Sequence, residues 1–393
     1  MAISTLLAAA AVGLMPGGQL NQTQVSDAKA AAGSTAAVGT SMLADLHKAD
    51  PEDNICVSPF SITMAGSMLR AGAGPEAESA LAKLLFQTAN GPTTHTRMGA
   101  LNQALKPFSE NGQLMIANGV WVNKAGGVKS SFRAMLQALY GAQTSSIDFG
   151  QPDSNKLVND WVSKRTGGKI TNLFGKFDRG TIMALANCVY FKDQWVDPLV
   201  DAGKMDFNIG RGRAAQTTFM SDSDVWYAKT PSFEVCTIPY KSGLAMQLFL
   251  PAESKSLKSV LGSKEFAVAL GNIDKSKTAH KVYVPNWTTK MDLNLADYWQ
   301  SKGGQILFSP RKGLFSGIND GETFISQAIH KTFIKVDRLG TEAAAATGIG
   351  ISLTSAPVQN GPTVYFNRQF IYAIVEPKTG TPLFVGIVSD PRE

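Results

Sequence analysis

The sequence predicts an α+β fold, because helical patterns dominate the first part of the chain and strand patterns dominate the last part. Apolar residues recur at helical spacing after Ser41. A long apolar run at residues 183–191 (MALANCVYF) is typical of a strand that is buried on both faces. Two apolar runs at residues 370–375 and 383–388 flank the turn sequence EPKTG, which indicates a hairpin.

The other elements follow from local signals. Residues 16–34 are small and polar without an apolar period, so we expect them to be disordered. The helix after Ser41 ends before Pro51. Ser58 then provides an N-cap for the next helix, with Pro59 at its first position. Further strands are expected at residues 55–57, 114–122, 246–250, 281–285 and 333–336. Further helices are expected at 75–85 and at 155–174, the latter in two pieces separated by Gly167-Gly168.

The composition is that of an ordinary globular protein, with 393 residues of which 44% are hydrophobic and 17% charged. The net charge is +6, but the basic residues are scattered and no run of five occurs, so nucleic-acid binding is not supported. Cys56, Cys188 and Cys236 each lie in an apolar run. An odd number of cysteines without a CxxC motif argues against a disulfide framework and against a zinc site.

The N-terminal run at residues 1–15 (MAISTLLAAAAVGLM) is too short to span a bilayer and is similar to the apolar core of a secretory signal. No Lys or Arg precedes this core, and the small-x-small sequence at 28–30 lies far from it. We expect the protein to be secreted, with a cytoplasmic location as the alternative.

No motif of a catalytic site is visible. HExxH, GxSxG and GxxxxGK[ST] are absent, and no GxGxxG follows a strand. Among the four histidines, His330 begins the strand pattern IHKTFIKV. We expect His330 to be a buried hydrogen-bonding residue rather than a catalyst, and we expect no enzyme activity, no cofactor and no metal.

The segment GTEAAAATG at residues 340–348 has an unusual pattern of small residues. In an extended strand, one side would carry Thr341, Ala343, Ala345, Thr347, Ile349, Ile351 and Leu353, and the other would carry Glu342, Ala344, Ala346, Gly348, Gly350, Ser352 and Thr354. No proline occurs before Pro357, but alanine and glycine form strands poorly on their own. The pattern favours a loop that joins a sheet later. A short capped helix or a linker remains an alternative.

Several sequence blocks occur in the order that is typical of one family. They are residues 54–61 (NICVSPFS), 159–173 (NDWVSKRTGGKITNL), 187–195 (NCVYFKDQW), 330–347, and the tail at 366–370 and 382–386. In these blocks the chain resembles the serpins over most of its length. After the expected leader and disordered segment at 1–34, the resemblance implies a single domain at 35–393. It also implies three sheets, eight or nine helices and an exposed reactive-centre loop at about 340–362.

The resemblance also implies a function. Inhibitory serpins present a bait bond in the exposed loop to a serine endopeptidase, or to a cysteine endopeptidase as an alternative. The protease forms an acyl-enzyme, and the cut loop inserts into the main sheet as a new strand and traps the protease. We therefore expect a monomeric, metastable suicide-substrate inhibitor whose partner is a target protease. The alternative is a non-inhibitory serpin that acts as a binding or carrier protein.

Site residues are implied by matching positions. A polar cluster beneath the point where the sheet opens, called the shutter in this family, matches Ser58, Ser61, Asn187 and His330. The tryptophan where insertion begins, in the region called the breach, matches Trp195. The hinge of the loop matches Gly340, Thr341, Glu342, Ala343, Ala344, Ala345, Ala346 and Thr347.

The position of the bait bond stays open among three candidates. Counting the family's usual loop length from Gly340 gives Thr354–Ser355. Counting back from Phe366 gives Val358–Gln359 instead, and Leu353–Thr354 is the third candidate.

Two features modify the expectation. Inhibitory serpins usually have glutamate two residues before the hinge glycine and a lysine partner for it, and these positions hold Arg338 and Asn286 here. That ion pair is therefore missing. No Lys or Arg occurs from residue 342 to residue 367, so a trypsin-like pocket with its carboxylate has nothing to bind. Elastase-like or subtilisin-like proteases fit better, with papain-like enzymes as an alternative.

Overall fold

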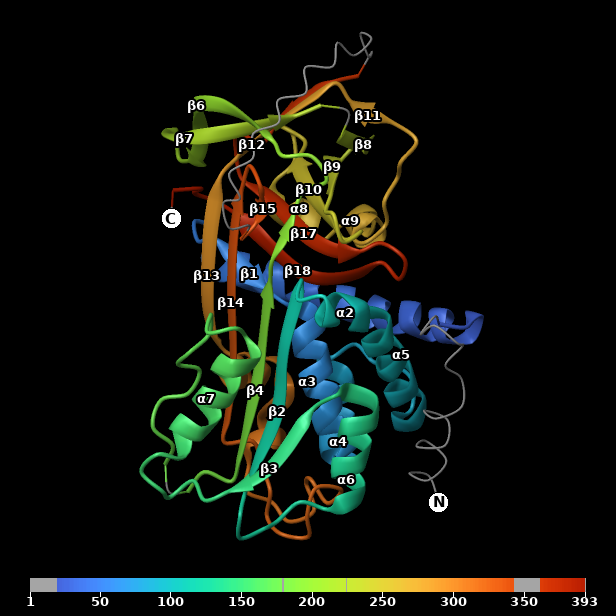
Figure 1. The fold of residues 1–393 in the computed structure, drawn as a ribbon, viewed down its shortest axis with the longest axis vertical. Helices are drawn as coiled ribbons and strands as arrows, with labels where there is room; N and C mark the ends of the chain where they lie inside the picture. The colour runs from blue at the N-terminus through green and yellow to red at the C-terminus, as the bar shows by residue number, and fades with distance from the viewer. Residues whose placement is uncertain (1–19, 179, 224, 343–360, 393) are drawn as a thin grey trace. The chain divides into compact units, whose positions relative to one another are not determined.

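A computed structural model describes residues 20–178, 180–223, 225–342 and 361–392. The chain divides into two compact units, which Figure 1 shows with their helices and strands labelled. Unit 1 comprises residues 1–38, 58–190 and 291–332, and unit 2 comprises residues 39–57, 191–290 and 333–393. The expectation of a single domain from residue 35 stays a prediction.

The described residues form nine α-helices and three β-sheets, which confirms the α+β prediction. The helices are α2 (Gln22–Ala49), α3 (Pro59–Ala71), α4 (Pro75–Leu84), α5 (Gly91–Glu110), α6 (Ser130–Met135), α7 (Ser154–Arg165), α8 (Leu257–Leu261), α9 (Lys264–Ala269) and α10 (Leu295–Trp299).

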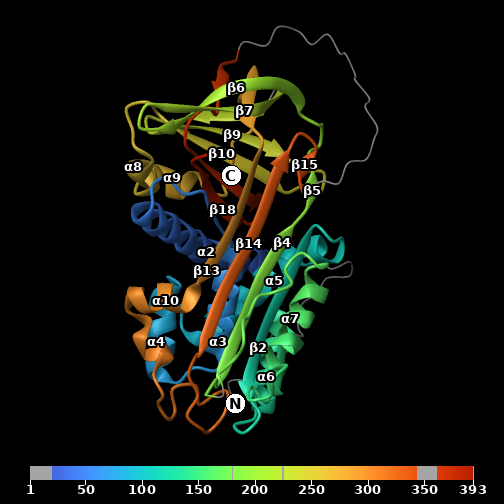
Figure 2. The ribbon, with the colours of Figure 1, turned by 90° about the vertical axis from the view of Figure 1, so that its left-hand side faces the viewer.

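Unit 1 is built of helices around one part of a sheet. Its strands are β2 (Leu114–Asn123), β3 (Gln143–Ile147), β4 (Met183–Phe191) and the first residues of β14 (Gln327–Asp337). Strands β4 and β14 pair in parallel, residues 184–188 with residues 327–331. The two views place α7 and α3 on opposite sides of β2 and β4 (Figures 1 and 2). On the α7 side, Val158 and Val162 belong to one buried cluster with Ala184, Ala186 and Cys188.

Unit 2 consists mainly of strands. They are β1 (Ile55–Val57), β5 (Asp193–Gln194), β6 (Val200–Gly210), β7 (Arg213–Asp222), β8 (Val225–Lys229), β9 (Phe233–Pro239), β10 (Ala245–Pro251), β11 (Thr278–Ala279), β12 (Lys281–Pro285), β15 (Gly340–Thr341), β16 (Thr363–Tyr365), β17 (Phe370–Glu376) and β18 (Thr381–Val388). One sheet has the order β1-β18-β17-β10-β9-β8-β11, and a four-stranded sheet has the order β16-β12-β7-β6. The predicted hairpin is confirmed as β17 and β18, which pair antiparallel.

The third sheet has the order β3-β2-β4-β14-β15-β5, with β13 (Trp287–Asn294) paired to β14. The apolar run that the sequence predicts as a central strand is β4, and it has a neighbour on each side. Strand β14 contributes residues to both units. This sheet positions the residues that are discussed below.

The prediction that residues 16–34 are disordered is wrong from Gln22 onward, because α2 begins there. The side chain of Asn21 accepts a hydrogen bond from the Gln24 backbone, and the Gln24 side chain accepts one from the Asn21 backbone, each at 2.9 Å. This reciprocal pair is a capping box. The buried side of the first turns consists of small residues at helical spacing: Ala28, Ala31, Ala32 and Thr35. Small side chains give only a weak apolar period. The expected leader at residues 1–19 lies outside the described residues.

The second helical piece expected at residues 170–174 is also wrong, since this stretch forms no helix. Asn159 on α7 explains the difference. Its Oδ1 accepts hydrogen bonds from the backbone N–H groups of Leu173 and Phe174, and its Nδ2 donates to the Phe174 carbonyl. One amide side chain therefore supplies the partners that a helix would have supplied.

Candidate functional site

The first two hinge residues already form a strand within the third sheet. Strand β15 lies between β14 and β5 and is antiparallel to both (Figure 2). Thr341 is opposite Val336 on β14 and opposite Asp193 on β5. The side chain of Thr341 is fully buried. The first two residues of the expected hinge are thus part of the third sheet, between β14 and β5.

Gly340 is required at its position for two reasons. Its φ angle of +150° lies in a region that side chains disfavour. A Cβ atom on Gly340 would also lie 2.1 Å from the carbonyl oxygen of Asp193 on β5. A larger residue would therefore force β15 away from its neighbour.

Two buried aromatic residues hold the start of the hinge. The Tyr240 hydroxyl is 2.6 Å from the Thr341 hydroxyl. The Tyr240 ring stacks on the Trp195 ring with 4.3 Å between centroids, and Trp195 Nε1 donates a hydrogen bond to the carbonyl of Asp337 on β14. Trp195, which the family resemblance assigned to the breach, thus lies beside the hinge. Sequence reasoning missed Tyr240, because nothing in its local sequence IPYKSG distinguishes it from a residue before a turn.

Asp193 brings a carboxylate into the same neighbourhood. Burial raises the pKa of Asp193 above its ordinary value of 3.8, while hydrogen bonds from Ser242 and Gln194 oppose that rise. The Gln194 backbone N–H donates to Asp193 Oδ1 at 2.8 Å. Asp193 pairs with Thr341 through the backbone, so a carboxyl group with a raised pKa lies on the strand next to β15.

In unit 1, the structure brings the shutter residues together around the first turn of α3. Ser58 is the N-cap of α3, and its side chain accepts a hydrogen bond from the Ser61 backbone. The Ser58 N–H donates to Nε2 of His330, a fully buried residue on β14, at 3.1 Å. The backbone of His330 is the register partner of Asn187 on β4. His330 is therefore a buried hydrogen-bond acceptor between α3 and the sheet.

Arg338 and Asn286, at the described positions of the missing ion pair, do not replace it with another hydrogen bond or ion pair between their side chains. Arg338 is exposed, and its carbonyl accepts a hydrogen bond from the Leu199 N–H. Asn286 donates its backbone N–H to the Thr218 carbonyl. Within the described ranges, Oδ1 of Asn286 is buried and has no partner, and neither side chain forms an ion pair.

Most of the loop lies outside the described residues. This applies to hinge residues 343–347 and to every residue of the candidate bait bonds: Leu353, Thr354, Ser355, Val358 and Gln359. Glu342 is the last described residue before this gap. Its φ angle is +46°, and its N–H donates to the Lys335 carbonyl at 2.7 Å. The described chain resumes at residue 361, just before β16.

The profile of the family described as "Serpin (serine protease inhibitor)" matches residues 33–391. The chain belongs to the serpin family. Alpha-1-antiproteinase of Rattus norvegicus is 29% identical to this serpin over 347 residues, which is 86% of this chain and 84% of that protein. Serpin A3-8 of Bos taurus is 30% identical over 369 residues, with 90% and 87% covered. Serpin-ZXA of Oryza sativa subsp. japonica is 30% identical over 360 residues, with 86% and 90% covered.

Solved structures share the fold of this serpin. The thermophilic serpin tengpin in its native state matches with a TM-score of 0.80 and 24% identity, over 95% of each chain. Human thyroxine-binding globulin in complex with thyroxine matches with a TM-score of 0.78 and 24% identity, over 93% of this chain and 100% of that one. At this level of identity the likeness shows the fold alone.

A group of metal ligands, a membrane-spanning helix or a reactive cysteine thiol in the described part of this serpin would indicate other chemistry. No group of three or more potential metal ligands occurs there, and no helix there is long and apolar enough to cross a membrane. Burial raises the pKa of the Cys188 thiol to about 12 and also raises that of Cys236, so neither is poised as a thiolate nucleophile.

Proposed function

We propose that this serpin is a suicide-substrate inhibitor that traps a serine endopeptidase as an acyl-enzyme by inserting its cleaved loop into the third sheet. Membership of a family described as serine protease inhibitors supports protease inhibition in general. Serpins are generally inhibitors rather than enzymes. The observation that carries the finer proposal is the position of β15, which lies between β14 and β5, where the inserted strand would begin.

A continuation of the β15 register along β14 would fit insertion. Thr341 is opposite Val336, so continued antiparallel pairing would bring Ala343 opposite Ile334 and Thr347 opposite His330. Residues opposite each other in a ladder point to the same face. The β14 residues Val336, Ile334, Thr332 and His330 are all buried, whereas Lys335 is exposed. The small hinge residues would therefore enter the buried face, and Glu342 would lie opposite the exposed lysine.

Insertion would release a large free energy. A dozen new ladder hydrogen bonds at about 0.5–1.5 kcal/mol each supply on the order of 6–18 kcal/mol. Ile349, Ile351 and Leu353 could each add about 1.5–3 kcal/mol if they become buried. These amounts are comparable with the whole stability of an ordinary domain. The uncut protein would then be metastable and held by a kinetic barrier.

The loop sequence sets the class of target. Residues 342–367 contain no Lys or Arg, and the candidate bait residues are small or aliphatic. We propose an elastase-like or subtilisin-like protease as the target, with Thr354–Ser355 as the bait bond. Leu353–Thr354 and Val358–Gln359 are the alternatives, and a papain-like cysteine protease is an alternative target.

The test is to incubate the protein with pancreatic elastase and with subtilisin, and to separate the products on a denaturing gel. Trapping predicts a stable adduct with the mass of inhibitor plus protease. Mass spectrometry of the small C-terminal fragment released from the adduct identifies the bait bond. Complete cleavage of the chain without an adduct for either protease would contradict the proposal.

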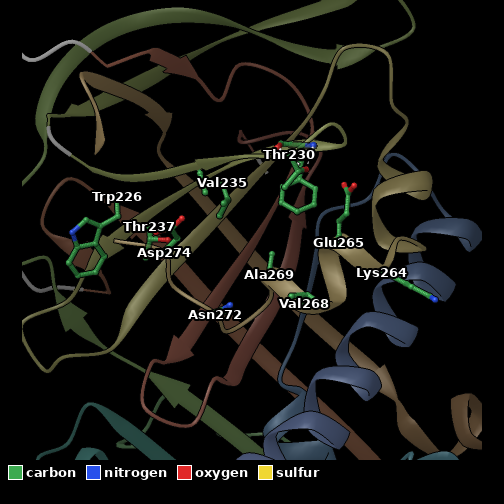
Figure 3. Close-up of a pocket in the computed structure, with 12 residues that line it drawn as sticks. Trp226, Thr230, Val235, Thr237, Lys264, Glu265, Val268, Ala269, Asn272 and Asp274 are labelled. Atoms are coloured by element: carbon green, nitrogen blue, oxygen red, sulfur yellow. Dashed lines mark hydrogen bonds between the residues drawn. The ribbon is translucent and has the colours of Figure 1, made fainter. Parts of the chain in front are cut away.

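A carrier function is the second candidate, and a pocket in unit 2 favours it. The pocket has a volume of about 470 Å³ and lies between strands β8 and β9 and helix α9 (Figure 3). Figure 3 shows Val235 and Thr237 on the strands facing Val268 and Ala269, with Trp226 at one end. This size is typical of small-molecule sites. Saturable binding of thyroxine or another apolar aromatic compound, together with an unchanged melting temperature after loop cleavage, would favour the carrier.

We also propose that the protein is secreted as a monomer, with a cytoplasmic location as the alternative. The apolar run at residues 1–15 supports export. Expression in a secreting host tests the location, because a cleaved signal predicts mature protein in the medium that lacks this run. Sedimentation of the purified protein tests the monomer.

A further inference from the structure

A second pocket of unit 2 has a volume of about 530 Å³, and the charged residues in its lining are mainly basic. Lys255 and Lys258 line it near α8, and Arg368 lines it from the segment before β17. Glu253 is the single acidic residue in its lining. In the described part of the chain, none of the three basic side chains forms an ion pair. Three basic residues against one acidic residue leave the pocket lining with a net positive charge.

His47 adds a polar group without a partner. This residue of α2 lines the same pocket and is only 8% exposed. Its Nδ1 is buried and has no hydrogen-bond partner among the described residues. Buried polar atoms in folded proteins nearly always have a partner, so an unpaired one needs an explanation. His47 therefore adds a buried imidazole to the wall of the pocket beside the basic side chains.

The walls of the pocket are fixed by hydrogen bonds between distant segments. Arg368 Nη2 donates to the Pro251 carbonyl at 3.0 Å, which holds the guanidinium against the end of β10. Gln369 Nε2 donates to the Pro51 carbonyl at 2.7 Å, which ties the same segment to the chain after α2. A site whose walls are fixed before binding loses little conformational entropy on binding.

We propose that this pocket binds a small molecule that carries a phosphate or sulfate group. A doubly charged tetrahedral oxyanion has several strong acceptors, and lysine and arginine are the side chains that bind such groups. The volume exceeds that of a single oxyanion, and polar lining residues such as Asn208 and Gln369 remain to contact the rest of the ligand. This inference concerns a site away from the hinge and does not depend on the proposed inhibition.

The experiment is isothermal titration of the full-length protein at constant ionic strength with inorganic phosphate, inorganic sulfate, glucose 6-phosphate and glucose. The proposal predicts saturable binding of the three anions and no binding of glucose. Tighter binding of glucose 6-phosphate would assign the site to a phosphate ester, and equal binding would assign it to the free oxyanion. Heats that match those of added sodium chloride for every anion would overturn the proposal.

Alanine variants of the lining lysines test whether phosphate binds in this pocket. Lys255→Ala and Lys258→Ala should each weaken phosphate binding about ten-fold, since each removes a charged hydrogen bond. Lys204→Ala is the matched control, because this exposed lysine on β6 is not in the pocket lining. It should leave the affinity unchanged. Melting temperatures without ligand verify that all variants fold. Equal weakening in Lys204→Ala and Lys258→Ala would also overturn the proposal.

Discussion

The hydroxyl groups of Tyr240 and Thr341 lie 2.6 Å apart in the interior of unit 2. Burial raises the pKa of Tyr240 well above its ordinary value, so the phenol stays protonated at all physiological pH values. The hydrogen bond therefore persists, and it joins the first hinge side chain to an aromatic pair whose other member is Trp195. Thr341, which the family resemblance assigns to the hinge, is thus held by a buried hydrogen bond in the uncut protein.

Replacing Tyr240 with Phe removes the hydroxyl and keeps the stacking on Trp195. We expect the free energy of unfolding to fall by about 1–2 kcal/mol, because Thr341 is left without its buried partner. The fraction of protease trapped should stay nearly unchanged, because Thr341 is in the sheet before and after insertion. Denaturant unfolding and the gel assay measure the two quantities. Tyr227→Phe, which removes a hydrogen bond to Glu234 elsewhere in unit 2, is the control. A marked loss of trapping that is specific to Tyr240→Phe would contradict this account.

Gly340→Ala should displace β15. The positive φ angle alone costs on the order of 1–3 kcal/mol, and the clash with the Asp193 carbonyl adds to it. We expect lower stability and a larger share of cleaved, untrapped inhibitor on the gel. Gly243→Ala is a matched control, because its φ angle is +93° but nothing lies within 4 Å of the added Cβ. If both variants lose the same stability and give the same share of cleaved inhibitor, the close approach of Gly340 to β5 contributes to neither quantity.

Thr341→Arg should convert the protein from an inhibitor into a substrate. The arginine would replace a side chain that is already fully buried in the uncut protein, where an unpaired charge costs several kcal/mol, so β15 should leave its place between β14 and β5 and the inserted strand would lose its start. The ratio of cleaved to trapped protein should rise about ten-fold or more. Thr363→Arg makes the same change at an exposed position on β16, beyond the loop, and should keep the trapping of the natural protein. Normal trapping by Thr341→Arg would show that Thr341 is not part of the inserted strand.

The raised pKa of Asp193 predicts a pH dependence of stability. Its folded pKa lies above the unfolded value, so the folded state holds this proton more tightly. The contribution of Asp193 is most favourable below the unfolded pKa and decreases as the pH rises through the folded pKa. Asp193→Asn should remove this decrease, so its stability relative to the natural protein should improve with rising pH.

Unfolding measured from pH 3 to pH 7 tests this prediction about Asp193. The exposed residue Asp206 on β6 provides the control variant Asp206→Asn. The free energies of unfolding of Asp193→Asn and of the natural protein are compared at each pH. A difference that does not vary with pH would show that burial of the carboxyl does not change its pKa on folding.

His330→Ala should reduce stability without removing any catalytic activity. The substitution leaves the buried Ser58 N–H without its acceptor, which costs about 1–3 kcal/mol. His280→Ala, at an exposed histidine, should have little effect on the free energy of unfolding. Calorimetric melting measures both variants. Unchanged stability of His330→Ala would remove the structural role that we assign to it.

The sequence was sufficient to predict an element where one local signal determines its structure. The Ser58-Pro59 pair predicted the start of α3, and the EPKTG turn predicted the β17–β18 hairpin. The prediction failed for the first part of α2, before Ser41, because the buried side of its first turns is made of alanine and threonine, which have little apolar contrast with their neighbours. The prediction of a helix at residues 170–174 failed because Asn159, which is distant in sequence, accepts the hydrogen bonds of this stretch. The sequence alone could not assign these hydrogen bonds.

For the candidate site, the sequence located some residues, and others became visible only in the structure. Family blocks located Trp195, Ser58 and His330, and the structure adds Tyr240 as the stacking partner of Trp195 and the nearby carboxylate of Asp193. These contacts depend on the tertiary fold, because Tyr240 and Thr341 are 101 residues apart in the chain. No local pattern predicts a pair at that separation.

The most direct test of the central claim compares the melting temperature of the intact protein with that of protein cut once in the loop by elastase. Insertion of residues 341–353 as a new strand predicts that the melting temperature rises by more than about 10 °C after the cut. An unchanged or lower melting temperature of the cut protein would contradict the claim that cleavage releases free energy stored in the native fold.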